Sequence, residues 1–336
     1  MTDRPVTFSA RVGGPDLAGL VAQAVNCEES GFDQVWCGND LFGGPGIVAW
    51  TMMLAATSRI KVGSGVIDPV SVHPAQIAQL ASGLQEMSGD RFLLGLGAGS
   101  DVFFSWAGLS PAKPAVRTRE AVIAIRELTE GRSPAGVPGA GAGWTPLARI
   151  KSPRPVPIYV GGMGPRMLNV TGRYADGALA LCLPPEHVFS VVEQVSAGAV
   201  AAGRDPGAVD VAACLWCSIS DDRTAARRLL AAHIAQYSGS LSVDALRANG
   251  LDPEEFDRTQ QLMLAERTEE AIDSVTESMM RLGVVGGVDE IIEQCATLIE
   301  AGVRHISFGP PMGTDPPEAV RLLGGKVLPE LRRLFG

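Results

Sequence analysis

The chain has 336 residues, of which 46% are hydrophobic and 19% are charged, and its formal net charge is −9. This composition is typical of a globular protein, and the length suits either two average domains or one α/β barrel. The acidic balance argues against nucleic acid or an anionic membrane surface as a partner. Because there is no run of 18 apolar residues and no basic-then-apolar leader, we expect a cytoplasmic protein without a membrane segment.

Six cysteines are scattered along the chain, and only Cys214 and Cys217 have the CxxC spacing. Both lie on the apolar run VAACLWCSI, and no second pair accompanies them. We therefore expect buried core thiols here rather than a metal or redox site. No HExxH or other metal-ligand spacing occurs elsewhere, so no metal is expected.

Apolar runs alternate with amphipathic segments along the whole chain, which predicts repeated strand-then-helix units. The predicted strands are Val6–Val12, Gln34–Cys37, Ile60–Val66, Phe92–Leu96, Pro157–Val160, Gly177–Leu181, Val209–Ile219 and His305–Phe308. The predicted helices after them are Asp16–Ser30, Gly46–Thr57, Pro74–Met87, Ala115–Glu130, Pro165–Tyr174, Pro185–Ala202, Arg223–Tyr237 and Pro317–Arg333. These units predict an α/β fold, a closed (β/α)8 TIM barrel whose continuously apolar strands are buried on both faces.

Two regions interrupt this alternation. Ser133–Ile150 is rich in Gly, Pro and Ala, which predicts a long irregular loop. Ser238–Gly287 is polar and predicts a mostly helical insertion. We expect a single domain over residues 1–336, with both additions on or near the βα side, where loops build active sites.

The stretch Pro157–Leu168, PIYVGGMGPRML, joins a buried strand to a helix through a glycine-rich turn. Pro165 suits the first turn of a helix, where its missing N–H would have no partner anyway. Free N–H groups and the positive end of the helix dipole favour a phosphate at such a turn. The alternative is an ordinary tight βα turn without a ligand. The side chain of Arg166 could likewise contact a phosphate or lie on a solvated face of the helix.

The active site of a barrel lies at the C-terminal ends of its strands, and these ends carry few acid–base groups here. Those present are Arg11, Asp40, Asp68 and His73. Asp68 and His73 both precede a proline, so they could instead start a turn and brace a helix, and Asp40 could cap a loop. So little proton-transfer machinery, with so much glycine and apolar wall, suits a flat organic cofactor that carries the reaction itself.

Three runs of sequence carry a family resemblance: GFDQVWCGNDLF, SRIKVGSGVIDPVSVHPAQIAQLASGLQEMSGDRFLLGLGAGS and PVPIYVGGMGPRMLNVTGRYADGALAL. They resemble the bacterial luciferase-like (LLM class) superfamily of barrel oxidoreductases. The closing run AGVRHISFGPPMGTDPPEAVRLLGGKVLPEL is similar to one branch, the deazaflavin-dependent methylenetetrahydromethanopterin reductases. The resemblance covers nearly the whole chain outside residues 133–150 and 238–287.

The resemblance implies a homodimeric reductase that holds coenzyme F420 in the barrel mouth and transfers a hydride to a small organic substrate. The phosphate-bearing tail would lie at the glycine-rich turn, and the ring would lie against a bulge with a non-proline cis peptide at Gly65–Val66. The residues that this places at the cofactor are Asn39, Gly65, Val66, Ile67, Asp68, Gly97, Ala98, Gly99, Gly161, Gly162, Met163, Gly164, Arg166 and Cys182.

Three positions depart from the family pattern. Arg11 stands where the reductases have a glutamate, Asn39 and Asp40 replace an acidic residue followed by histidine, and LCLPP at 181–185 lacks a phosphate-side lysine. An arginine cannot give up its proton at neutral pH, so we expect Arg11 to bind a carboxylate on a different substrate. Arg11, Asp40 and His73 are the expected catalytic residues, which would polarise the hydride acceptor.

Other functions stay open at this stage. The same barrel could be an FMN-dependent monooxygenase that needs a partner reductase, or a methylenetetrahydrofolate reductase-like enzyme that uses NADH directly. The missing carboxylate on the first strand argues against the NADH enzyme. A binding protein or inactive subunit is the alternative that is not an enzyme.

Overall fold

The structure, a computed structural model, describes residues 5–110, 112–241 and 243–336. The strands in these ranges are β1 Thr7–Val12, β2 Gln34–Cys37, β3 Lys61–Ser64, β4 Phe92–Leu96, β5 Ile158–Gly161, β6 Gly177–Leu181, β7 Asp210–Ile219, β8 Gly283–Gly286 and β9 His305–Met312. The α-helices are α1 Leu17–Glu29, α2 Gly46–Ala56, α3 Pro74–Ser88, α4 Asp101–Trp106, α5 Pro114–Thr129, α6 Pro165–Tyr174, α7 Val188–Ala201, α8 Arg223–Tyr237, α9 Val243–Ala248, α10 Pro253–Leu264, α11 Thr268–Asp273, α12 Glu277–Met280, α13 Val288–Glu300, α14 Pro316–Leu322 and α15 Leu328–Phe335.

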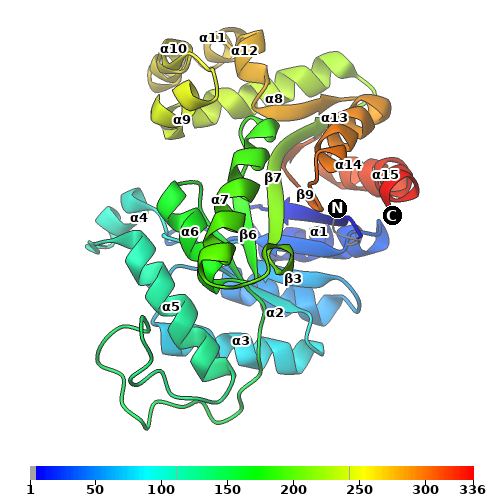
Figure 1. Cartoon of the computed structure of the whole chain (residues 1–336). Helices are drawn as coiled ribbons and strands as arrows, with labels where there is room; N and C mark the ends of the chain where they lie inside the picture. Colours follow the sequence, from blue (N-terminus) through cyan, green and yellow to red (C-terminus); the bar gives the residue numbers. More distant parts are fainter. Residues whose placement is uncertain (1–4, 111, 242) are drawn as a thin grey trace.

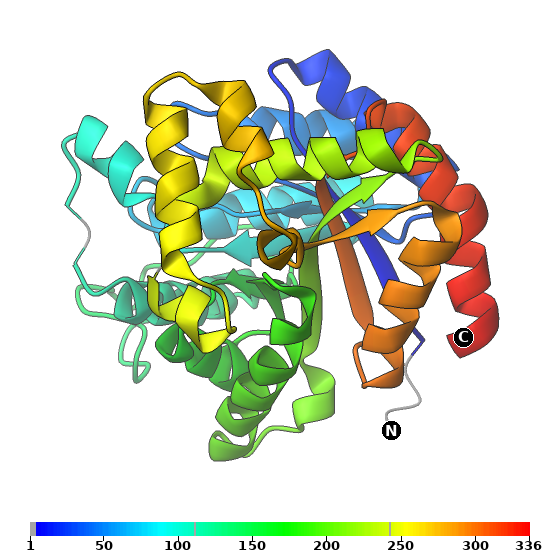
Figure 2. The same ribbon diagram turned by 90° about the horizontal axis from the view of Figure 1, so that it is seen from above.

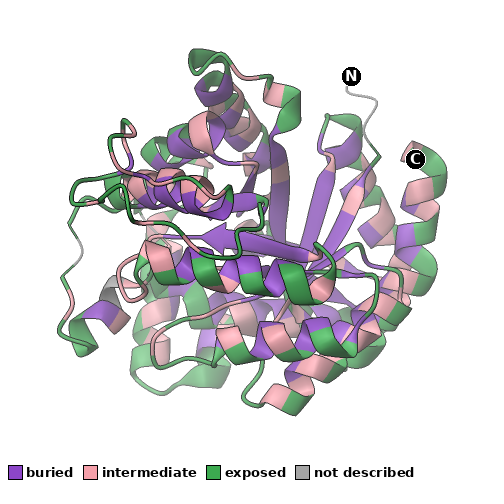
Figure 3. Ribbon diagram, turned by 90° about the horizontal axis from the view of Figure 1, so that it is seen from below, coloured by how far each residue is buried: buried purple, intermediate pink, exposed green. Residues whose placement is uncertain are grey.

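The predicted barrel is confirmed. Strands β6, β5, β4, β3, β2, β1, β9 and β7 follow one another in parallel pairing, and β6 also pairs with β7, which closes the ring. The strands are buried on both faces, as their apolar runs predicted, and helices with exposed outer surfaces surround them (Figure 3). Large side chains fill the interior: the rings of Trp36 and Tyr159 meet edge to face, 5.0 Å apart.

One strand lies inside the segment that the sequence predicted to be mostly helical. Strand β8 ends the predicted insertion and pairs with the last residues of β7, from Trp216 to Ile219. It lies outside the ring, because β7 is ten residues long and pairs with β6, β9 and β8 in turn. The run GVVG that forms β8 is too short to show a hydrophobic periodicity, so it could not be distinguished from the helical segments around it. Helices α4 and α13 were not predicted either.

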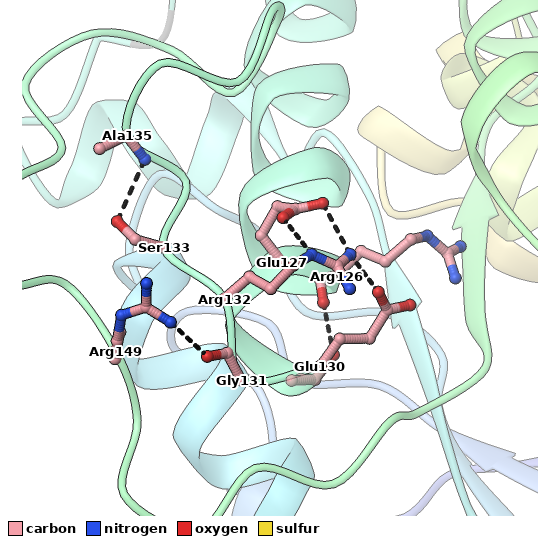
Figure 4. Close-up of polar contacts among 9 residues, drawn as sticks. Arg126, Glu127, Glu130, Gly131, Arg132, Ser133, Ala135 and Arg149 are labelled. Carbon is pink, nitrogen blue, oxygen red and sulfur yellow. Dashed lines mark hydrogen bonds and ion pairs between the residues drawn. The ribbon is translucent and has the colours of Figure 1, made fainter. Parts of the chain in front are cut away.

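Residues 133–150 form an irregular connection between α5 and β5, as predicted, but this is an αβ rather than a βα connection. Arg132 binds the carboxylates of Glu127 and Glu130 where the connection begins, and Arg149 donates to the Gly131 carbonyl at 2.9 Å (Figure 4). These contacts close the base of the loop. From this loop, the ring of Trp144 lies 5.5 Å from that of His73.

Helices α9 to α12 pack with α8 beyond one end of the barrel (Figures 1 and 2). Their apolar side chains form a small core with Leu183 and Trp216, which lie at the ends of β6 and β7. The insertion therefore covers one side of the barrel mouth. In the part of the chain that the structure describes, no helix is long and apolar enough to cross a membrane.

Candidate active site

The glycine-rich turn leads from β5 directly into α6, as the sequence predicted. Gly164 precedes the helix and offers it no side-chain cap, and Pro165 is its first residue. No described residue accepts a hydrogen bond from the backbone N–H groups of Met163, Gly164 or Arg166. Three free donors and the positive end of the helix dipole make this turn suitable for an anion.

The glycines of this turn serve different purposes. A Cβ at Gly162 would lie 2.4 Å from Cγ of Met167, so this glycine lets the first turn of α6 pack against the strand. A Cβ at Gly164 would have no heavy atom within 4 Å, and this residue faces open space. Gly164 therefore borders the anion site itself, whereas Gly162 is required by packing.

Two arginines flank the start of α6. Arg166 and Arg119 line a cavity of about 380 Å³ between the first turns of α5 and α6, and Val116 and Asn169 form part of its walls. The Nε of Arg119 is buried without a hydrogen-bond partner among the described residues. Its Nη2 forms an ion pair with Glu120 at 3.7 Å, which leaves the Nε without a partner in the described chain. Sequence reasoning missed Arg119, because it lies on a helix 46 positions from the turn.

The predicted cis peptide at Gly65–Val66 is present. The chain then continues between two strand ends: the Val66 carbonyl accepts from Asn39 N, and Ile67 exchanges backbone bonds with Gly95 and Gly97. The Val66 side chain rests over the end of β4 and β5. A Cβ at Gly97 would lie 2.4 Å from its Cγ2, and one at Gly161 would lie 2.9 Å from its Cγ1. Both glycines therefore make room for Val66 to form the floor of the mouth.

Two predicted cofactor contacts are limited by burial. The side chains of Ile67 and Cys182 are wholly buried in the barrel's main apolar core, so only the backbone of these residues could meet a ligand in the mouth. The sequence placed them at strand ends but could not show on which face the side chains lie. Gly99 has a φ of +77° and is needed for packing, since a Cβ there would lie 2.2 Å from the ring of Phe104. Ala98, between Gly97 and Gly99, is half-buried.

Asp68 serves as a turn residue, the alternative that the sequence left open. Its carboxylate accepts from the Val70 and Ser71 N–H groups at 2.9 and 2.6 Å and from the Ser71 hydroxyl at 2.5 Å. With three donors satisfying it, this buried group has little capacity left for a ligand. Its charge still matters, because desolvation and then the Asp68 carboxylate raise the pKa of the nearby Asp40 above its ordinary value. Asp40 stands exposed at the rim.

Asn39 and His73 both help to start helices. The Asn39 Oδ1 accepts from Ile47 N at 3.4 Å at the beginning of α2. The Nδ1 of His73 accepts from Ala75 N at 3.2 Å and caps α3. His73 thus braces its helix, as one of the two predicted alternatives proposed, and its exposed ring still borders the mouth beside Trp144.

Arg11 extends from the end of β1 across β9 towards β7. Its Nη2 donates to the Leu215 carbonyl at 2.5 Å, and the guanidinium lies flat on Gly309, where a Cβ would come within 2.0 Å of Nη2. The Nε is buried without a partner among the described residues. Arg11 is therefore on the opposite side of the ring from the α6 turn, and no contact joins it to Asp40 or His73 in the described structure.

An aromatic cluster next to Arg11 was not predicted. On α8, the His233 ring meets Trp216 edge to face at 4.7 Å and Tyr237 at 4.7 Å. The Nε2 of His233 is buried and has no hydrogen-bond partner in the described chain. Burial, and then the charge of Arg11, lower the pKa of His233 to about 4, so the imidazole is neutral at pH 7.

A buried polar network lies beneath the mouth, inside the barrel. The His305 ring is within hydrogen-bond distance of Ser9 Oγ at 2.8 Å and of Asp210 Oδ2 at 2.7 Å, and the Tyr159 hydroxyl donates to the same carboxylate oxygen at 2.9 Å. All four side chains are at least 94% buried. Such a network stabilises the interior and is closed to substrate. Cys214 and Cys217 are free, buried thiols, as predicted, and so are the other four cysteines.

Together these features define a (β/α)8 barrel with an uncapped helix N-terminus after β5 and a mouth poor in acid–base groups. Barrels of this kind bind phosphate-bearing cofactors with the loops at the C-terminal ends of their strands. The chain belongs to the luciferase-like monooxygenase family, whose model matches residues 4–305.

Curated relatives are similar over nearly their whole length. The 5,10-methylenetetrahydromethanopterin reductase of Archaeoglobus fulgidus is 31% identical over 91% of this chain and 93% of its own. The F420-dependent glucose-6-phosphate dehydrogenase of Nakamurella multipartita is 30% identical over 100% of this chain and 99% of its own.

Solved structures agree with this assignment. The coenzyme F420-dependent tetrahydromethanopterin reductase from Methanopyrus kandleri superposes with a TM-score of 0.89 at 25% identity and covers 97% of this chain and 99% of its own. An F420-dependent secondary alcohol dehydrogenase, at 21% identity and a TM-score of 0.79, shares the fold over 97% of this chain and 99% of its own.

Proposed function

We propose that this protein is a coenzyme F420-dependent oxidoreductase acting on a small organic substrate, most simply as a reductase. The proposal rests on the start of α6, which has no side-chain cap and has two arginines beside it. The side chain of Val66, which forms the floor of the mouth, lies nearby over the ends of β4 and β5. A planar ring with a phosphate-bearing tail fits this combination. The curated relatives that match the whole chain are named as F420-dependent enzymes or as methylenetetrahydromethanopterin reductases.

Each part of the mouth has a task in this proposal. When bound, F420 supplies or accepts the hydride. The N–H groups of Met163, Gly164 and Arg166 hold the tail phosphate, and Arg119 adds positive charge beside it. Val66 supports the ring from below. Asp40, exposed at the rim, is placed to contact the substrate.

The test is a fluorescence and absorbance titration of the purified protein with F420, FMN and NADH. We expect F420 to bind more tightly than the other two. The double variant Arg119→Ala, Arg166→Ala should weaken F420 binding at least tenfold, since two charge-assisted contacts are lost. Arg173→Ala, at the other end of α6 over the Tyr174 ring, is the matched control and should change affinity less than twofold. Preference for FMN would favour the FMN-dependent monooxygenase, and binding of NADH alone would favour the methylenetetrahydrofolate reductase-like enzyme.

We also propose that the protein is a cytoplasmic homodimer. Helix α2 is apolar around its whole circumference and leaves Val48 and Met52 exposed, which favours a partner that covers it. Exposed Phe42 and Met87 lie on neighbouring segments. Six free, buried thiols suit a reducing compartment.

A further inference from the structure

We propose that Arg11, His233 and Trp216 form a substrate subsite for an anionic group, so that the substrate carries a carboxylate or a phosphate. This inference rests on the proposed function, because it concerns the molecule that exchanges a hydride with the cofactor. The three side chains come from β1, α8 and β7, on the side of the barrel away from the α6 turn.

The first argument is that Arg11 is built into the mouth without a counter-ion. No carboxylate of the described residues lies within 4.0 Å of its guanidinium, although most arginines that make side-chain contacts in this structure have one. Its one protein acceptor is the Leu215 carbonyl, and its buried Nε has none. A half-buried cation in this state is costly unless an anion meets it.

The thiols and the imidazole around Arg11 cannot supply that negative charge. The nearby thiols are Cys182, Cys214 and Cys217, and burial raises the pKa of each above its ordinary value, so they stay protonated. His233 is neutral at pH 7 for the reason given above. Glu29 and Arg321 line the same pocket as Arg11, and their opposite charges offset each other. An anionic ligand would neutralise the charge of Arg11 itself.

The second argument is that Arg11 is fixed in place. Gly309 leaves a flat surface on which the guanidinium rests, and in the sheet Gly309 pairs with Trp216, the residue that follows Leu215. Arg11 is thereby held beside the Trp216 ring. An arginine whose side chain only contacts solvent does not need to be fixed by packing. A planar guanidinium held in one orientation suits recognition of a carboxylate or phosphate.

The third argument is the unsatisfied imidazole. The buried Nε2 of His233 has no partner, and the ring is fixed between Trp216 and Tyr237. A buried polar atom of this kind normally has a hydrogen-bond partner, which a bound ligand would provide. A neutral imidazole can donate to an anionic oxygen without adding charge, so Arg11 supplies the charge and His233 a directed hydrogen bond.

The experiment uses inorganic phosphate and acetate as probes, titrated calorimetrically into the full-length protein at pH 7. Because the α6 turn is itself proposed to bind phosphate, the titrations are made in an Arg119→Ala, Arg166→Ala background and repeated with F420 present. In this background, Arg11→Ala should weaken binding of both probes at least tenfold, Arg11→Lys less, and His233→Phe about threefold to tenfold. Anion binding that Arg11→Ala and Arg11→Lys leave unchanged would overturn the inference.

Folding and the proposed function are controlled separately. Thermal melting identifies a variant that does not fold, and if Arg11→Ala fails, Arg11→Lys and His233→Phe decide, since both conserve volume. F420 affinity is measured in the same variants and should remain within twofold of the parent. If the protein binds no F420 but loses acetate binding on Arg11→Ala, the proposed function is wrong and the subsite stands. If the protein binds F420 but neither phosphate nor acetate, the subsite is wrong and the proposed function stands.

Discussion

The packing of Val66 against Gly97 allows a sharp test of the floor of the mouth. In Gly97→Ala the new Cβ would lie 2.4 Å from Val66 Cγ2 and 3.3 Å from Val66 Cβ. Ordinary contacts between carbon atoms are about 3.5–4.0 Å, so Val66 must move by about 1 Å. It cannot retreat towards β5, because its Cγ1 already occupies the space over Gly161. Overpacking of this kind costs about 1–3 kcal/mol.

We therefore expect Gly97→Ala to lower the free energy of unfolding by about 1–3 kcal/mol and to weaken F420 binding at least tenfold. Denaturant unfolding and a fluorescence titration measure the two effects. Gly164→Ala is the matched control: its Cβ meets no atom within 4 Å and its φ is −79°, so stability should change by less than about 0.5 kcal/mol. The argument fails if the two variants have the same stability, or if Gly97→Ala binds F420 as tightly as the parent protein.

Three further predictions concern stability and assembly. Asp210→Ala leaves the Tyr159 hydroxyl and the His305 ring without their shared buried partner. It should lower the free energy of unfolding, measured with denaturant, by about 3–5 kcal/mol. An unchanged unfolding midpoint would contradict a stabilising role of the network. Burial raises the pKa of Glu28, but hydrogen bonds from three backbone N–H groups and a hydroxyl outweigh it and lower the pKa to about 2. Because that carboxylate's pKa is depressed in the folded state, its stabilisation is present above about pH 4.5 and is lost as the pH falls towards 2, and Glu28→Gln should remove this part of the acid dependence of the melting temperature. Met52→Lys should convert a homodimer into monomers in sedimentation velocity, and an unchanged mass would place the interface elsewhere.

The sequence by itself determined the barrel. Eight apolar runs separated by amphipathic helices predict a closed parallel barrel, in which the strands bury both faces and the crossovers are right-handed. The glycine-rich turn before Pro165 was also visible, since strand, turn and helix start are contiguous in the chain. The cis peptide at Gly65–Val66 was reached through the family resemblance and not through local propensity.

Only the tertiary structure decided which side chains share the mouth. Arg119 and His233 lie on helices, and their relation to the α6 turn and to Arg11 depends on how those helices pack on the ring. Ile67 and Cys182 lie at strand ends, but the register and the bulge turn them into the core. The positions of the strands along the chain follow from hydrophobic pattern, which is local. The contacts of a strand-end side chain depend on register and on neighbours far away in the chain, which no local pattern records.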